Sequence, residues 1–249
     1  MRVLFSTTNK HKIREANEIG KFFLRFTFFF FLNAFFKTAK VLKIHERSER
    51  ISFPKRKRFK SRVLFSTTNK HKIREANETG KIYGIEFEQV IINYPEIRND
   101  KFENIASDGV KYVYEKINRQ VIVEDSGIII DALNGFPGTF SAYVEKKLGN
   151  KGILNLMRDV EEQNRTARYI SVVAFFDGKI LKTFVGTVDG KISTEERGSG
   201  GFGYDPVFIP DGYKETFGEN PEPKKEISHR RKSVEEFCKF YAKYNSREI

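Results

Sequence analysis

The sequence has no tryptophan, two methionines and a single cysteine, Cys238, in 249 residues. One cysteine excludes an internal disulfide framework and a cysteine-rich zinc site, and it is typical of a reducing, cytoplasmic compartment. A membrane-spanning helix needs about 20 apolar residues. The phenylalanine-rich stretch 22–36 is shorter than that and is interrupted by Arg25 and Asn33. It also lacks the small-residue cleavage site of a signal peptide. We therefore expect no spanning segment.

An excess of charge is also missing from the larger part of the chain. The whole sequence carries a net charge of +12 at pH 7, which by itself points to nucleic acid or an anionic membrane as partner. Residues 62–249, however, contain 29 basic and 29 acidic side chains, so the excess lies in residues 1–61. Residues 62–249 have the length of one domain, for which no nucleic acid is required as a partner.

Residues 2–20 and 62–80 form a near-identical repeat that differs only in Ile19 against Thr79. Two copies without a fixed period indicate a duplicated start and not a solenoid. The stretch 21–61 between them holds 11 of the 25 phenylalanines and a net charge of +10. We expect residues 1–61 to lie outside the catalytic fold and the second copy to occupy the sheet, because it closes the shorter loop. An open alternative is that 21–61 binds an anionic membrane surface or nucleic acid.

Residues 62–249 alternate between apolar runs and helical periodicity, which predicts an α/β fold. Apolar runs predict strands at residues 62–65, 85–92, 121–123 (continued by 128–132), 168–176 and 179–188. Helical spacing predicts helices that end near Gly80 or cover residues 102–117, 137–148, 152–158 and 233–244. Pro137 suits the first turn of its helix. Asp177-Gly178 predicts an antiparallel hairpin, so we expect a mixed central sheet flanked by helices.

The polar segment 66–72, Ser-Thr-Thr-Asn-Lys-His-Lys, stands where the first predicted strand turns into a helix. A helix start exposes free N–H groups and a partial positive charge, so anions bind there. The segment lacks the spacing of a Walker loop or a dinucleotide fingerprint. The alternative is an ordinary helix cap made by Thr or Asn, followed by a solvated basic turn.

Two adjacent carboxylates, Glu124 and Asp125, follow the apolar run 121–123. Such a pair is costly to bury unless it binds a cation or a hydrogen-bond donor. Asp125 is therefore a candidate for holding Mg²⁺ or activating water, with a turn-forming aspartate as the alternative. Glu96 is a candidate second carboxylate, although as an isolated residue it is more typical of the surface.

The glycine-rich segment 200–206 surrounds Phe202 and includes Asp205. Glycines let the backbone approach a flat ligand, on which Phe202 would stack. The alternative is a tight turn around a core phenylalanine. Lys224 and the triplet Ser228-His229-Arg230 offer donors suited to a base that carries carbonyl oxygens, and their alternative is a basic helix start.

Taken together and in this order, these segments resemble the inosine/xanthosine triphosphate pyrophosphatases. The matching stretches are STTNKHK (66–72), VEDSG (123–127), ALNGFPGTFSAYV (132–144), GFGYDPVFIPDGY (201–213), TFGE (216–219) and ISHR (227–230). The stretch YPEI (94–97) and the short route from it to VEDSG resemble archaeal members more than bacterial ones. The resemblance covers residues 62 to about 243.

The resemblance implies hydrolysis of ITP, dITP and XTP to the monophosphate and pyrophosphate with Mg²⁺, by a homodimer with two lobes around a nucleotide cleft. Glu96 and Asp125 would bind the metal, and Asp125 would orient or deprotonate the attacking water. The implied substrate contacts are Thr67, Thr68, Asn69, Lys70, His71, Lys72, Lys111, Ser126, Phe202, Gly203, Tyr204, Asp205, Lys224, His229 and Arg230. Donors aimed at the 6-oxygen would disfavour adenine, because an unpaired buried donor costs about 1–3 kcal/mol.

Two positions depart from the family pattern: Pro223 replaces an acidic residue, and Ala142 stands where some relatives carry a basic one. Two other functions stay open. One is a nucleotide pyrophosphatase that prefers dTTP or UTP, against which GFGYDP and ISHR argue. The other is a basic protein that binds nucleic acid or membranes through residues 21–61, against which the neutral charge of residues 62–249 argues.

Overall fold

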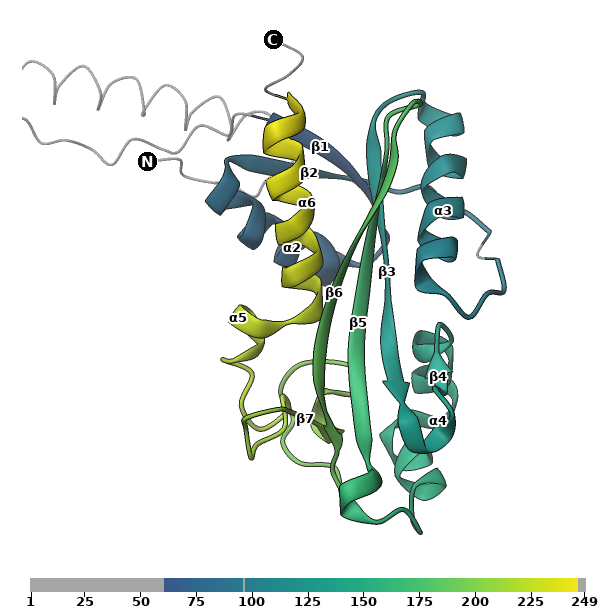
Figure 1. The fold of residues 1–249 in the computed structure, drawn as a ribbon, viewed down its shortest axis with the longest axis vertical. Helices are drawn as coiled ribbons and strands as arrows, with labels where there is room; N and C mark the ends of the chain where they lie inside the picture. The colour runs from purple at the N-terminus through teal and green to yellow at the C-terminus, as the bar shows by residue number, and fades with distance from the viewer. Residues whose placement is uncertain (1–60, 96, 246–249) are drawn as a thin grey trace, which may run out of the picture. The chain divides into compact units, whose positions relative to one another are not determined.

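The computed structural model describes residues 61–95 and 97–245, in which seven strands form one mixed sheet (Figure 1). The strands are β1 (Ser61–Ser66), β2 (Ile85–Val90), β3 (Val121–Ile130), β4 (Pro137–Gly138), β5 (Thr166–Phe176), β6 (Leu181–Ile192) and β7 (Phe208–Pro210). Their order is β2-β1-β3-β5-β6-β7, with β4 beside β3. β1 is parallel to β2 and β3, and the other pairs are antiparallel. The predicted mixed sheet is confirmed.

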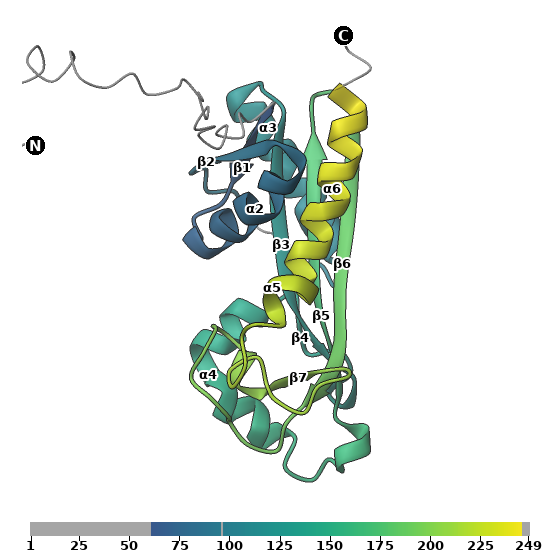
Figure 2. The ribbon, with the colours of Figure 1, turned by 90° about the vertical axis from the view of Figure 1, so that its left-hand side faces the viewer.

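Helices cover both faces of the sheet. They are α2 (Lys70–Tyr83), α3 (Phe102–Ile117), α4 (Ser141–Leu156), α5 (Lys224–Ile227) and α6 (His229–Asn245), with short 3₁₀ turns at Asp131–Leu133, Glu162–Asn164 and Asp205–Val207. α2 and α6 pack together on one face, while α3 lies on the other (Figures 1 and 2). Alternate strand residues therefore enter different cores: Phe65 and Ile122 meet α2 and α6, whereas Leu64 and Val123 meet α3. Burial on both faces explains the unbroken apolar runs in the sequence.

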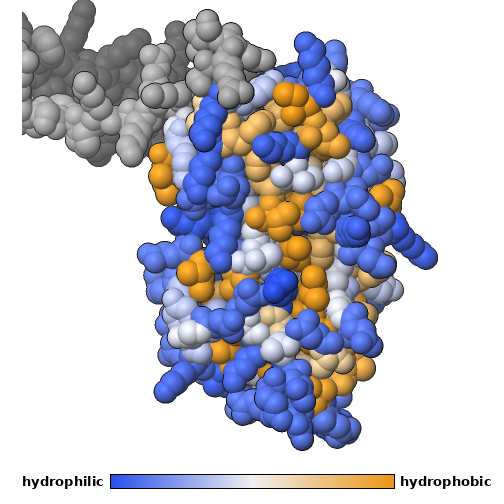
Figure 3. Space-filling model, viewed as in Figure 1, coloured by the Kyte–Doolittle hydropathy of each residue, from blue (hydrophilic) through white to orange (hydrophobic). Residues whose placement is uncertain are grey.

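The strands β3, β5 and β6 continue beyond these helices into a second part of the fold, around α4 and β7 (Figure 1). A separate core fills this part and includes Ile128, Ile153, Tyr169 and Phe208. On the side seen in Figure 3, hydrophilic side chains cover most of the surface and hydrophobic residues appear in small groups among them. The described residues thus form two packed regions that share the long strands.

β2 and β3 lie on opposite sides of β1 in the sheet. The chain passes from β1 to β2 on one side, and the connection through α3 then brings it back to β3 on the other side, so the order of the strands reverses at β1. Phe65 pairs with Ile122, the second residue of β3, so β1 ends beside the beginning of β3 and close to the acidic pair. In α/β sheets, ligands favour the carboxyl ends of strands at such a reversal. β3 continues past the acidic pair to Ile130, and β5 pairs with it over its whole length.

Two helix starts differ from the prediction. Pro137 does not open a helix but pairs with β3, and α4 begins at Ser141. The Ser141 hydroxyl oxygen accepts a hydrogen bond from the N–H of Ile128 at 2.8 Å, which ties this segment to the sheet. α6 begins at His229, four residues before the predicted helix, because the Ser228 hydroxyl accepts from the N–H of Arg231 at 3.1 Å.

The second copy of the repeat provides β1 and most of α2, and its strand lies in the sheet as predicted, where it pairs with β2 and β3. The first copy and residues 21–60 lie outside the described residues. Each helix within 61–95 and 97–245 is too short or too polar to span a membrane.

Candidate functional site

A cavity of about 400 Å³ opens where β1 ends beside β3. We call it the first cavity. Ten of the residues predicted from the sequence line it, and they come from α2, β3, the glycine-rich segment, α5 and α6. They are Asn69, Lys72, Asp125, Ser126, Phe202, Gly203, Tyr204, Lys224, His229 and Arg230. The fold therefore brings together residues that lie up to 161 positions apart in the chain, Asn69 and Arg230.

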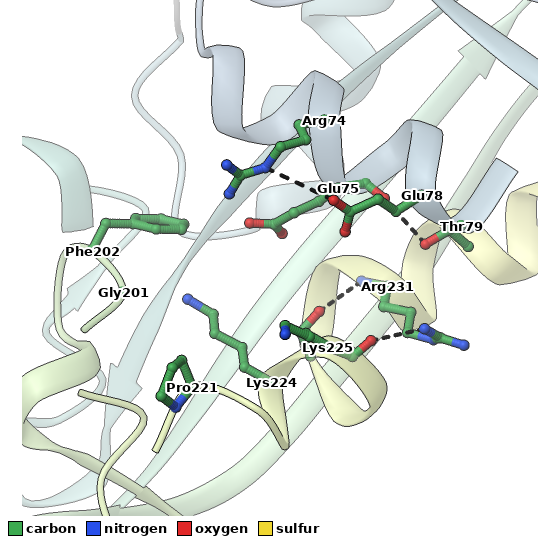
Figure 4. Close-up of a pocket in the computed structure, with 11 residues that line it drawn as sticks. Arg74, Glu75, Glu78, Thr79, Gly201, Phe202, Pro221, Lys224, Lys225 and Arg231 are labelled. Carbon is green, nitrogen blue, oxygen red and sulfur yellow. Dashed lines mark hydrogen bonds and ion pairs between the residues drawn. The ribbon is translucent and has the colours of Figure 1, made fainter. Parts of the chain in front are cut away.

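A second cavity, also of about 400 Å³, lies between α2 and α5 (Figure 4). Phe202 and Lys224 line both cavities, so these two side chains mark where the cavities meet. In Figure 4 the Lys224 side chain points toward the Phe202 ring, and the carboxylate of Glu75 lies on the α2 side. The two cavities therefore adjoin at Phe202 and Lys224, and the other residues that line them differ.

Seven predicted site residues line neither cavity: Thr67, Thr68, Lys70, His71, Lys111 and Asp205, together with Glu96, which lies outside the described residues. Thr68 and Lys70 are exposed at the start of α2. Lys111 is exposed on α3, so its contact with phosphate stays a prediction. Glu96 lies outside the described residues, and its role as a metal ligand also stays a prediction.

Asn69 caps α2 at the edge of the first cavity. Its side-chain oxygen accepts a hydrogen bond from the N–H of His71 at 2.8 Å, and the Thr67 hydroxyl accepts from the N–H of Asn69 at 3.1 Å. The helix-cap interpretation of this segment is therefore correct. It does not exclude anion binding, because the N-terminal end of α2 still directs its partial positive charge toward the cavity.

Glu124 is fully buried at the side chain and binds two of the predicted cations. The Lys72 ammonium lies 2.7 Å from Oε2, and the Arg230 Nε lies 3.2 Å from Oε1. Arg230 also donates to Glu75 at 2.9 Å and to the Ser126 hydroxyl at 3.1 Å. Burial alone would raise the pKa of Glu124, but the charges of Arg230 and then Lys72 outweigh it and hold that pKa below its ordinary value. Glu124 is thus ionised and holds the side chains of Lys72 and Arg230 in place.

Asp125, the other member of the acidic pair, is partly buried and lines the first cavity. Successive residues of a strand point to opposite faces, so Asp125 and Glu124 meet different surroundings. Within the described ranges, no group of three His, Cys, Asp or Glu side chains is arranged to hold a metal. Mg²⁺ usually takes only one or two protein carboxylates and completes its shell with waters and substrate phosphates. Asp125 fits that kind of site.

A second buried carboxylate, Asp205, organises the glycine-rich segment. It is fully buried and accepts hydrogen bonds from the Phe202 N–H at 2.8 Å, the Lys224 ammonium at 2.6 Å and the Tyr169 hydroxyl at 3.2 Å. A Cβ on Gly201 would lie 2.1 Å from the Asp205 carboxylate, and its φ is +74°, so this position needs glycine. Asp205 does not line either cavity, but it holds Phe202 and Lys224, which line both.

Phe202 is not a core residue, because 36% of it is exposed. Its ring centroid lies 5.5 Å from that of His71 and 4.1 Å from the Lys224 ammonium. The alternative, a tight turn around a core phenylalanine, is therefore wrong in placing the Phe202 side chain in the core. An exposed aromatic face next to a cation suits a flat, electron-rich ring.

His229 is 3% exposed and stacks on Tyr169, with ring centroids 4.6 Å apart. Burial, followed by the positive charges of Arg230 and Lys224, holds the pKa of His229 well below its ordinary value. The imidazole is therefore neutral near pH 7. Its Nδ1 has no hydrogen-bond partner within the described residues.

Several residues of the site escaped the sequence analysis. Glu75 lies three residues after Lys72 on the same helix, so helical spacing could have identified it. Ser171 belongs to an apolar strand and Ser233 to a charged helix start, and neither carried a recognisable signal, although both hydrogen-bond near Glu124. Glu145 lines the first cavity from α4, whose start the sequence misplaced.

Comparisons with known proteins agree on one family. Residues 63–240 match the family model of the Ham1 family. A dITP/XTP pyrophosphatase of Methanopyrus kandleri is 49% identical over 182 residues, which cover 72% of this chain and 96% of that protein. A dITP/XTP pyrophosphatase of Thermococcus kodakarensis is 46% identical over 178 residues, covering 71% and 95%. The solved structure of the Staphylococcus aureus Ham1 protein superposes with a TM-score of 0.65 at 26% identity, covering 74% of this chain and 99% of that one.

Proposed function

The chain belongs to the Ham1 family, and from that premise we propose that it hydrolyses dITP, ITP and XTP to the monophosphate and pyrophosphate. The observation that carries the proposal is the pair of cavities that meet at Phe202 and Lys224. One end offers a helix start, Lys72 and Asp125, and the other offers an exposed aromatic face among donors and acceptors. A nucleotide has the same two ends, a charged phosphate chain and a flat ring.

The triphosphate binds in the first cavity. Lys72 and the N-terminal end of α2 meet its negative charge, and Asp125 orients the water that attacks the α-phosphorus. The bond from the α-phosphorus to the bridging oxygen breaks, pyrophosphate leaves with that oxygen, and the proton of the water passes to Asp125 or to solvent. Positioning and charge neutralisation are the main demands of such a reaction, and these side chains meet them.

Pyrophosphatases of the Ham1 family are generally metal-dependent, and we propose Mg²⁺ as the metal. Asp125 would hold it together with phosphate oxygens and Glu96. A bound Mg²⁺ supplies charge neutralisation at the phosphates. Removal of divalent metal with a chelator should abolish turnover, and added Mg²⁺ should restore it.

The purine ring lies against Phe202 where the two cavities adjoin, near Lys224, with its 6-oxygen directed into the first cavity. His229 and Arg230, which lie at the first helical positions of α6, stand next to Lys224 around the first cavity and offer N–H donors to the 6-oxygen. Adenine would direct its 6-amino group at these donors and leave a buried donor unpaired. The same geometry favours hypoxanthine and xanthine over adenine.

One assay tests the function. Purified full-length protein with Mg²⁺ is given dITP, ITP, XTP, ATP, GTP, dTTP and UTP separately, and the products are identified. We expect pyrophosphate and monophosphate from the first three, with kcat/KM at least about ten-fold above that for ATP, the discrimination that one unpaired donor provides. Orthophosphate with diphosphate would show a different bond cleavage. A preference for dTTP or UTP would support the alternative base specificity.

We propose further that the catalytic domain is residues 62–249 and that the protein is a homodimer. A chain that starts at Arg62 should keep the activity of the full chain, and light scattering should give twice the mass of one chain. If deletion of residues 1–61 abolishes binding to RNA or anionic vesicles, the basic segment has a separate binding role. A substrate from the nucleotide pool favours the cytoplasm as the place of action.

A further inference from the structure

Two serine hydroxyls are buried beneath the first cavity and line neither cavity. Ser171 lies in the middle of β5 and Ser233 on α6, and both are fully buried. Their Oγ atoms are 2.8 Å apart, and the Ser171 Oγ lies 2.6 Å from Oε1 of Glu124. The two serines therefore connect the ionised carboxylate on β3 to the helix that carries His229 and Arg230.

The ionised carboxylate fixes the direction of the first hydrogen bond in this chain. An ionised carboxylate only accepts, so Ser171 must give its single proton to Glu124. Ser171 then has no proton left for Ser233, so the single proton of the Ser233 hydroxyl is shared between the Ser171 Oγ at 2.8 Å and the backbone oxygen of Arg230 at 3.0 Å. Hydrogen bonds to an ionised group are about twice as strong as neutral ones. The link from Ser171 to Glu124 is thus the strongest of the three.

The backbone explains why the two hydroxyls meet. Ser171 pairs with Ser126 on β3 and with Gly186 on β6. A Cβ on Gly186 would lie 2.1 Å from the backbone oxygen of His229 and 2.5 Å from the N–H nitrogen of Ser233. Only a glycine allows the start of α6 to approach the sheet this closely. The close approach brings Ser233 within reach of Ser171.

The hydrogen bond from Ser171 also fixes which oxygen of Glu124 faces which cation. Oε1 receives Ser171 and the Nε of Arg230, which leaves Oε2 directed at the Lys72 ammonium 2.7 Å away. We infer that Ser171, held by Ser233, is a positioning residue for the proposed reaction: it orients Glu124 so that one oxygen holds Lys72 toward the phosphates and the other holds Arg230 toward the ring. This inference rests on the proposed function.

The test compares single and double variants with dITP as substrate. Ser171→Ala should lower kcat about ten-fold while KM rises less than about three-fold, because the cations remain but are misplaced for the transition state. Ser233→Ala should lower kcat less, since Ser171 can still donate to Glu124. Ser193→Ala is the matched control: Ser193 is another buried serine, and its hydroxyl donates to the backbone oxygen of Glu195. We expect it to keep the wild-type kcat.

The double variant separates positioning from general support of the fold. In a Glu124→Gln background, Ser171→Ala should lower kcat less than two-fold, because Ser171 acts only through the carboxylate. A ten-fold loss in both backgrounds would overturn the inference, as would a kcat for Ser171→Ala equal to that of Ser193→Ala. Melting temperatures identify any variant that fails to fold. If Ser171→Ala fails to fold, the kcat of Ser233→Ala is compared with that of Ser193→Ala, and equal values would overturn the inference. If the wild-type protein does not hydrolyse dITP, it is the proposed function that fails.

Discussion

Both ends of the site position a lysine side chain, but they use different parts of the fold to do so. Each end holds a lysine on a fully buried carboxylate, Lys72 on Glu124 at the phosphate end and Lys224 on Asp205 at the ring end. Glu124 belongs to a strand with neighbours on the sheet, whereas Asp205 begins a short 3₁₀ turn after the glycine-rich segment.

This difference predicts that variants at the two ends of the site affect different kinetic constants. Regular elements hold side chains more precisely than loops do, so changes at the phosphate end should act mainly on kcat. Changes at the ring end should act mainly on KM and on the choice of base.

The largest expected effect is at the phosphate end. Asp125→Asn removes the charge that would hold the metal and orient the water, and we expect kcat to fall roughly 10³-fold. Pyrophosphate release with dITP measures the loss. Asp108→Asn, on the exposed side of α3, is the matched control and should keep full activity. A variant at position 125 with more than a tenth of the wild-type kcat would remove Asp125 from the chemistry.

Lys72→Met should give the next largest effect, because it removes a cation near the phosphates and leaves Glu124 with Arg230 as its charged partner. We expect kcat to fall about 100-fold and the free energy of unfolding to fall by about 1–3 kcal/mol. Kinetics and urea denaturation measure the two effects. Lys81→Met, an exposed lysine in the last turn of the same helix, should change neither. A normal kcat would place the phosphates elsewhere.

Phe202→Ala tests the ring end. Loss of a stacking face worth about 1–3 kcal/mol should raise KM about ten-fold for every base and change kcat little. Tyr213→Ala, which removes another exposed aromatic ring that lines neither cavity, is the control. Should kcat fall more than KM rises, the proposed division between the two ends would be wrong.

The smallest expected effect concerns stability against pH. The pKa of buried His229 lies well below its ordinary value of 6.5, so the unfolded chain takes up this proton first. The stability that neutral His229 contributes is therefore complete above pH 6.5 and is lost as the pH falls below it, with a slope of at most about 1.4 kcal/mol per pH unit.

Denaturant unfolding of wild type and His229→Gln between about pH 5 and 6.5 measures that contribution. The variant should show a shallower slope. Glu124 does not titrate in this pH range. Its pKa is lowered by folding, so the stability that ionised Glu124 contributes to the protein is lost only below about pH 4.5, the ordinary pKa of a glutamate. Equal slopes in the two proteins would show that His229 is not held neutral by the fold.

The sequence predicted the elements well where the signal is local. The strand–turn–helix at residues 62–80 and the Asp177-Gly178 hairpin are both present in the structure. The predicted break between two helices before residue 152 corresponds to the non-helical Gly149 within α4. The helix predicted from Pro137 is absent because pairing with β3 outweighs the local preference of proline for a first turn. Tertiary pairing decides such cases.

The sequence by itself determined the chemistry that each short segment can offer, because hydroxyls, lysines, carboxylates and glycines act through residue type and close spacing. Only the tertiary structure decided that Glu124 is a buried anchor while Asp125 lines the first cavity, and that Ser171 and Ser233 meet 62 residues apart. The physical reason is that strand register and the approach of α6 to the sheet set these contacts. Both depend on packing between segments distant in the chain, which no local pattern encodes.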